Sequence, residues 1–205
     1  MNSRREALGS ETHGYGSTWI ARMSRPVAAL LLAMLVLGPA APVPASAADA
    51  ATLEGSARGA LESLYRQNPG ARALRSKATG VLVFPNMVKA GFLFGGQIGE
   101  GVLFKGGRAA GYYNSVAASY GFQAGAKAFG YALFFMNADA LSYLDKSAGF
   151  QLGAGPSLVV LNAGMAASLT NATITEDIYA FVFNQTGIMG GIGIEGSKIT
   201  KINKK

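Results

Sequence analysis

From residue 80 onward the chain is a series of short apolar runs separated by glycine and asparagine, and this pattern restricts the fold more than any other feature. The runs are rich in Val, Leu, Phe and Tyr, residues that favour strands. They cover residues 81–84, 92–94, 102–104, 131–136, 158–161 and 178–183. Several are apolar at every position, which predicts a sheet whose two faces are both covered, by helices, by a second sheet or by closure of the sheet.

Glycine is the second constraint on the fold. The chain holds 28 glycines, and within strands this residue marks bulges, bends and close backbone approach. A small, strongly coiled sheet needs many such positions. The predicted fold class is α+β: a Gly-rich antiparallel β-sheet or small barrel-like sandwich, with an N-terminal amphipathic helix and one or two short helices.

The amphipathic helix is predicted over residues 53–68, where the apolar residues follow helical spacing. It should end at Asn68-Pro69-Gly70, because proline cannot continue the hydrogen-bond ladder. On its other face acids and bases alternate four residues apart at Glu54, Arg58, Glu62 and Arg66, so that face is neutral. This favours docking on the protein's own core over insertion into a membrane surface.

Two shorter helices are expected around residues 71–77 and 137–146. In the second, Asn137 is the predicted N-cap, and Leu141 and Leu144 should face inward.

The first 47 residues are not expected to belong to the domain. Residues 1–22 are polar and are interpreted as an over-long start. Residues 23–47 have the parts of a secretory signal peptide: a basic start, the apolar run 27–37, and Ala45-Ser46-Ala47 for cleavage. The prediction is therefore an exported protein, periplasmic or secreted and peripheral on the envelope membrane, with one domain at 48–205.

Composition excludes most catalytic and metal chemistry. The chain has no cysteine, and its single histidine, His13, lies in the leader. The domain therefore lacks a Ser-His-Asp or Cys-His arrangement, a zinc site of the usual type, a disulfide and a lipidated cysteine. No enzyme, metal or cofactor is predicted. The glycine segment 95–101 leads into an apolar run instead of a helix, so a hairpin connection is preferred over a phosphate loop.

Charge points to an anionic partner. Four of the 18 Lys and Arg and two of the 11 Asp and Glu precede residue 48, which leaves a net charge of +5. If folding gathers the cations, they would hold anionic phospholipid head groups, each contributing about 1 kcal/mol. The candidate head-group residues are Arg66, Arg72, Arg75, Lys77, Lys89, Lys198 and Lys201. The candidate apolar residues, for membrane or core contact, are Leu53, Leu61, Leu64 and Tyr65. Nucleic acid is not an expected partner, and the alternative is a structural or protein-interaction module for an envelope or host partner.

Several motifs in a fixed order resemble the SYLF domain family, also called an actin-binding-domain family. They are residues 80–85 (GVLVFP), 89–92 (KAGF), 95–101 (GGQIGEG), 111–114 (GYYN), 119–125 (SYGFQAG), 135–136 (FM) and 195–199 (EGSKI). The resemblance covers about Ala73 to Ile202, with Gly190-Gly191 as a departure from the family pattern. It implies a lipid-binding module: eukaryotic relatives bind phosphoinositides and some bundle actin, while bacterial relatives are exported. It also implies lipid contact through the 53–68 helix and the cations Arg66, Arg72, Arg75 and Lys77.

Overall fold

The computed structural model describes residues 49–92, 94–120, 125–146, 149–161, 174–187, 194 and 196–204. These belong to the second of the chain's two compact units, Ala47–Lys205. The predictions for residues 1–22, for the signal peptide at 23–47 and for Gly190-Gly191 lie outside the described residues.

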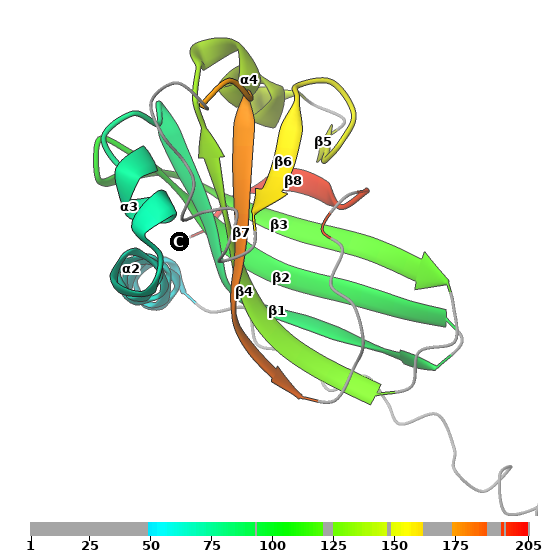
Figure 1. The fold of residues 1–205 in the computed structure, drawn as a ribbon. Helices are drawn as coiled ribbons and strands as arrows, with labels where there is room; N and C mark the ends of the chain where they lie inside the picture. The colour runs from blue at the N-terminus through cyan, green and yellow to red at the C-terminus, as the bar shows by residue number, and fades with distance from the viewer. Residues whose placement is uncertain are drawn as a thin grey trace, which may run out of the picture. The chain divides into compact units, whose positions relative to one another are not determined.

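Among the residues that the structure describes, two helices precede a sheet into which one short helix and a 3-10 turn are inserted (Figure 1). The elements are α2 (Ala50–Gln67), α3 (Pro69–Leu74), β1 (Gly80–Phe92), β2 (Phe94–Lys105), β3 (Arg108–Tyr120), β4 (Gly125–Phe135), α4 (Ala138–Ser142), η1 (Tyr143–Asp145), β5 (Phe150–Gln151), β6 (Leu158–Leu161), β7 (Ile178–Gly187) and β8 (Lys198–Ile202). The predicted α+β class is confirmed.

The strands form one curled eight-stranded sheet in the order β5-β8-β3-β2-β1-β4-β7-β6. Every neighbouring pair is antiparallel except β6 and β7, which run parallel. The sheet is therefore mixed, which corrects the prediction of an antiparallel one. The 16 residues between Leu161 and Ile178 are long enough for the crossover that a parallel pair requires.

The central strands are longer than the apolar runs predicted. β1 has 13 residues and β2 has 12. β1 passes through Pro85 at a bulge, where the register with both neighbours shifts. The glycine segment 95–101 is not a hairpin connection, because all of it lies inside β2 and pairs with β3. Its glycines make room for packing: a Cβ on Gly99 would overlap the Met87 Sδ atom.

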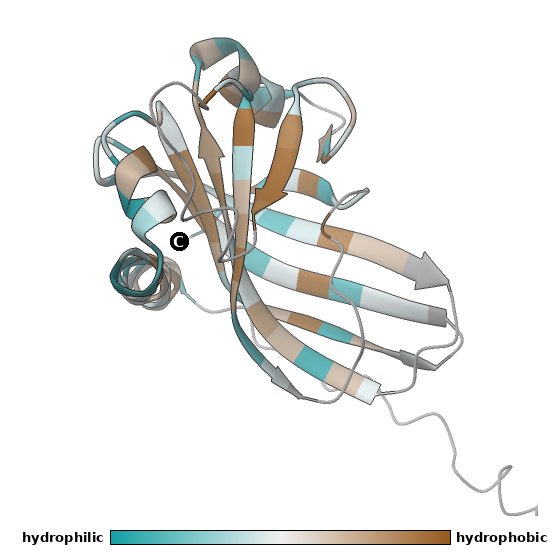
Figure 2. Cartoon of the chain, in the orientation of Figure 1, coloured by the Kyte–Doolittle hydropathy of each residue, from teal (hydrophilic) through white to brown (hydrophobic). Residues whose placement is uncertain are grey.

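Both faces of the sheet are covered along most of the fully apolar runs, as predicted. On the face that α2 and α3 cover lies the helix-side cluster: Leu53, Ala57, Leu64, Tyr65, Ala71, Leu74, Val81, Val83, Val102, Phe104, Ala132, Phe134, Leu161, Tyr179, Phe181 and Phe183. On the other face lies the α4-side cluster, with Leu82, Phe84, Met87, Leu103, Tyr113, Phe129, Tyr131, Leu133, Phe135, Leu141, Leu144, Phe150 and Ile199 among its residues. In Figure 2, β6 and the upper part of β4 are brown, the colour of apolar residues.

Local sequence fixes the ends of α2. The Asp49 side chain accepts a hydrogen bond from the Thr52 N–H at 2.7 Å and caps the start of the helix. Asn68 follows its last residue and accepts from the Ala71 N–H at 3.0 Å, so it begins α3 with Pro69 in the first turn. The predicted stop at Asn68-Pro69-Gly70 is confirmed.

Asn137 is the N-cap of α4, as predicted, and accepts from the Ala140 N–H at 2.7 Å. Leu141 and Leu144 are buried, although Leu144 lies in η1, so the predicted single helix is a short α-helix followed by a 3-10 turn. Asp177 holds the cap in place. It accepts from Asn137 Nδ2 at 2.7 Å and from the Ser157 N–H at 2.9 Å.

The bonds to Asp177 predict an acid-sensitive contribution to stability. Hydrogen bonds from Ser157 and Asn137 hold the pKa of Asp177 below its usual value, so the stabilisation is present above the unfolded pKa and is lost as pH falls through the folded one. In urea unfolding, Asp177→Asn should be less stable than the parent at pH 7, and the difference should shrink below about pH 4. Glu176→Gln, the neighbouring acid, should show no such pattern. A deficit in Asp177→Asn that stays constant with pH would contradict this role.

A cationic groove beside α2

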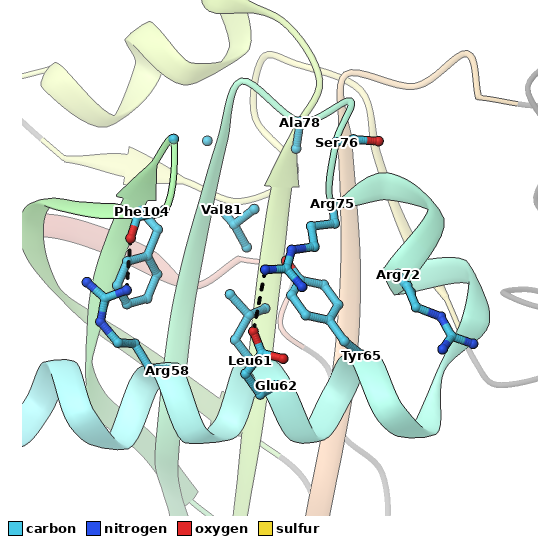
Figure 3. A pocket seen from close by; sticks show the side chains of 13 residues that line it. Arg58, Leu61, Glu62, Tyr65, Arg72, Arg75, Ser76, Ala78, Val81 and Phe104 are labelled. Carbon is cyan, nitrogen blue, oxygen red and sulfur yellow. Dashed lines mark hydrogen bonds and ion pairs between the residues drawn. The ribbon is translucent and has the colours of Figure 1, made fainter.

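A groove of about 810 Å³ lies between α2, α3 and the adjoining ends of β1 and β2 (Figure 3). Its lining combines three arginines, one carboxylate, two aromatic rings and the backbone of the β2–β3 turn. The lining residues are Arg58, Leu61, Glu62, Tyr65, Arg72, Arg75, Ser76, Ala78, Gly80, Val81, Phe104, Gly106 and Gly107.

Helical spacing places one flank of α2 along the groove. Arg58, Leu61, Glu62 and Tyr65 are three or four residues apart, so their side chains lie on neighbouring positions of the helix surface. Tyr65 is 5% exposed and Leu61 is half-buried against the helix-side cluster. Apolar residues of α2 therefore form the floor of the groove while Arg58 and Glu62 reach its rim.

Arg58 is held by three partners. Its Nη1 donates to the Gly107 carbonyl oxygen at 2.8 Å, its guanidinium lies 4.8 Å from the centre of the Phe104 ring, and Glu54 is 3.9 Å away on the preceding helical turn. Cation–π contact and a backbone acceptor restrict the guanidinium, and Glu54 adds a long, partly exposed ion pair. This cation is pre-positioned at the turn end of the groove.

Arg75 follows α3 and faces α2. Its Nη2 is 3.7 Å from Glu62 Oε1, and its guanidinium lies 5.1 Å from the centre of the Tyr65 ring. The Arg75 and Glu62 side chains are 61% and 53% exposed, so their ion pair is weak and open to exchange with another anion. Burial raises the pKa of Tyr65 to about 12, which keeps its hydroxyl neutral at physiological pH.

Arg72 is the exposed third arginine, on α3. Figure 3 shows it at the opposite end of the groove from Arg58, with Arg75 between them. Three guanidiniums with one lining carboxylate make an electropositive groove. A guanidinium donates paired hydrogen bonds to phosphate or carboxylate oxygens, so the arrangement is suited to an anionic ligand.

The structure divides the predicted head-group residues among several places. Arg72 and Arg75 line the groove, while Arg66 lies exposed on α2 and Lys77 is exposed in the turn after α3. Lys89 is 6% exposed on β1, so it is removed from the protein surface. On β8, Lys198 is exposed, and Lys201 lies 3.4 Å from Asp145.

The predicted apolar residues mostly face the core. Leu53, Leu64 and Tyr65 are buried in the helix-side cluster, and Leu61 packs against it. Of the two uses considered for this stripe, the structure shows core contact.

Sequence reasoning missed Arg58, Phe104 and the turn Gly106-Gly107. Arg58 was hidden because its spacing from Glu54 and Glu62 marked it as part of a neutral helix face. The turn had a signal: two consecutive glycines between strands indicate a two-residue hairpin that needs positive φ at both positions. Their φ values are 55° and 77°, and the second supplies the carbonyl that binds Arg58.

Within the described residues, no group of three or more His, Asp or Glu side chains could hold a metal ion. Among the same residues, no helix is both long and apolar enough to cross a bilayer. The groove presents cations, aromatic faces and a turn carbonyl, which are groups for holding a ligand. The fold and the groove thus define a binding domain.

Comparison with known families agrees with this class. Residues 116–205 match the family model Ysc84, described as "Las17-binding protein actin regulator", which confirms the relationship to the SYLF family. No curated protein matches the chain. The matched part runs from the second half of β3 to the end of the chain, so every residue that lines the groove precedes it.

Proposed function

We propose that the protein is an exported, non-catalytic binding module that holds anionic phospholipid head groups in the groove beside α2. One observation carries the proposal: three arginines and a single carboxylate line a groove of about 810 Å³. That volume is within the usual range for a small-molecule site of about 300–1,000 Å³. A phosphodiester between Arg72 and Arg75 would replace the exposed Glu62 as the partner of Arg75.

The contact with the membrane is shallow in this proposal. An amphipathic helix that enters a bilayer buries its apolar face in the acyl region, but in α2 that face is already packed on the sheet through Leu53, Leu64 and Tyr65. The helix contributes the wall of the groove instead of a membrane anchor. Binding should therefore be mainly electrostatic and reversible.

The double variant Arg72→Ala/Arg75→Ala tests the groove. Loss of two cations at about 1 kcal/mol each should weaken binding to vesicles containing about 30% phosphatidylglycerol roughly 30-fold. Co-sedimentation across a range of lipid concentrations measures the effect. Arg66→Ala/Lys201→Ala is the charge-matched control, because both residues are exposed and neither lines the groove; we expect less than about a three-fold change.

Two results would count against the head-group site. One is an equal loss of vesicle binding in the two double variants, which would indicate that binding depends on the net charge of the protein and not on a specific site. The other is parent binding that ignores the anionic lipid fraction or persists in about 1 M salt, where the Debye length is about 3 Å.

A protein ligand is the second candidate, since the description of the matched family names a protein partner. In that case the Arg72→Ala/Arg75→Ala variant would lose a saturable protein partner in cross-linking, while the parent protein would not bind vesicles.

A further inference from the structure

The sheet extends past α2 and leaves an uncovered apolar row on the face that the helix packs against. In this row Val88 of β1 pairs with Ile98 of β2, Ile98 pairs with Val116 of β3, and Val88 pairs with Ala128 of β4. Val88, Ile98 and Val116 are 45%, 58% and 44% exposed and are the large exposed hydrophobic residues of the described chain.

The next row toward the strand ends is also uncharged. Ala90 pairs with Gly96 and Ala126, and Gly96 pairs with Ala118; all four are exposed. We call these two rows the apolar patch. Strands about 4.8 Å apart and rows about 7 Å apart give it an area on the order of 300 Å². This is comparable to the largest apolar patch of an ordinary monomer, and such patches are commonly binding sites.

The size of the patch argues against a second copy of the chain as its occupant. A stable dimer buries about 800 Å² per partner, more than twice the estimated area. The first row of the patch also has paired strands on both of its sides, since Val116 pairs with Lys198 of β8 and Ala128 pairs with Thr186 of β7, so this row offers no free strand edge for pairing. A flat, shallow apolar contact remains.

The charges around the patch fit an anionic surface. At the end of the first row Lys198 of β8 pairs with Val116 and is exposed. Toward α2, the acidic residue of β2 next to the patch is Glu100. Its Oε2 atom lies 2.6 Å from Lys204 Nζ, so its charge is paired. The groove opens on the same face of the sheet, beyond α2, since Val81 and Phe104 belong both to its lining and to the helix-side cluster.

We propose that the apolar patch rests against the acyl-chain boundary of an anionic bilayer while the groove holds head groups. This inference rests on the proposed function and adds a second, apolar contact to it. The aliphatic row is bordered by Lys198 and by Glu100, which is ion-paired with Lys204. The row can therefore enter the interfacial region of a bilayer without burying an unpaired carboxylate.

A single tryptophan provides a direct test. Trp19 is the only tryptophan of the chain, so in the full-length chain Trp19→Phe/Ile98→Trp places one indole on the patch. With vesicles containing about 30% phosphatidylglycerol, its emission should shift to the blue and be quenched by brominated acyl chains; phosphatidylcholine vesicles should have no effect. Trp19→Phe/Ala138→Trp is the control and should not respond. Ala138 is exposed on α4, which packs on the opposite face of the sheet.

A polar variant avoids the membrane preference of tryptophan itself. Ile98→Ser should weaken co-sedimentation about 10-fold, because an aliphatic contact is lost, whereas Ala138→Ser should match the parent.

The outcomes separate the two proposals. The patch proposal is wrong if the protein binds vesicles while the indole at position 98 stays unquenched and Ile98→Ser binds as tightly as the parent. The groove proposal would survive that result. No vesicle binding at all would overturn both. A blue shift that needs no vesicles and grows with protein concentration would identify a second copy as the occupant and overturn the bilayer contact.

Discussion

Replacing Phe134 with alanine is expected to lower the free energy of unfolding by about 3–5 kcal/mol, the usual cost of removing a buried aromatic ring. Phe134 is fully buried on β4. Its ring meets Tyr65 of α2 edge-on at 6.2 Å between centroids and Phe181 of β7 at 5.3 Å. The ring therefore joins the helix to two strands, and urea denaturation of the variant measures its contribution.

Two companion variants show whether the effect belongs to this packing. Phe134→Leu keeps most of the volume and should cost less than about 1.5 kcal/mol, while Val88→Ala, on the exposed patch, should stay within about 0.5 kcal/mol of the parent. In hydrogen exchange, Phe134→Ala should release the amides of α2 earlier than those of β1. If α2 kept its protection while stability fell, the helix would be held by other contacts.

The parts of the fold that depend on neighbouring residues were predictable. Asn68 and Pro69 end one helix and begin the next, and Asn137 caps α4, because each bond joins residues three or four positions apart. The apolar stripe of α2 likewise predicted that one face of the helix would be buried. Capping and amphipathic spacing are local properties that a sequence displays directly.

The strand lengths and pairings were less accessible, because they depend on partners far along the chain. Pro85 and the glycines of β2 have the composition of breaks between strands. In the structure Pro85 lies at a bulge of β1. Gly99 and Gly101 instead lie beside the side chains of Met87 and Phe84, both on β1. The parallel pairing of β6 with β7 leaves no local mark at all.

The position of Lys89 shows how one bulge changes a predicted site. Val81 and Val83 lie on the face that α2 covers, and simple alternation along β1 would place residue 89 on that face too. The register shifts between Val83 and Val88. After it, Met87 belongs to the α4-side cluster and Lys89 is buried. A cation assigned to the binding surface by composition is therefore turned to the other side of the sheet.

The groove itself combines local and distant contributions. Arg72 and Arg75 were predicted because they follow the helix in sequence, and they lie together because α3 is short. Arg58 acquires its place from Gly107, 49 residues away. Spacing on the helix indicated only that Arg58 alternates with Glu54 and Glu62. A helix face that is neutral in the sequence therefore contains a pre-positioned cation in the fold.

Gly101→Ala is expected to destabilise the protein by about 3 kcal/mol, at the upper end of the usual cost of overpacking. An added Cβ would lie 2.7 Å from the Val83 carbonyl oxygen and 2.7 Å from Phe84 Cδ1. The Phe84 ring is fully buried and stacked on Tyr131, and Val83 is paired with Val102 on one side and Ala132 on the other. Because a backbone atom in the centre of the sheet cannot retreat without breaking this register, the methyl group must be accommodated by separating β1 from β2.

Gly96→Ala, in the same strand and the same glycine segment, is the matched control. There the nearest atom to an added Cβ is the Ala117 carbonyl oxygen at 3.7 Å, an ordinary contact, so stability should change by no more than about 0.5 kcal/mol. Thermal and urea unfolding of both variants measure the contrast. Equal destabilisation would show that the segment needs glycine for backbone conformation. The strand pairing argues against a phosphate loop in this segment. If both variants kept their stability but lost anion binding equally, the phosphate-loop interpretation would have to be restored.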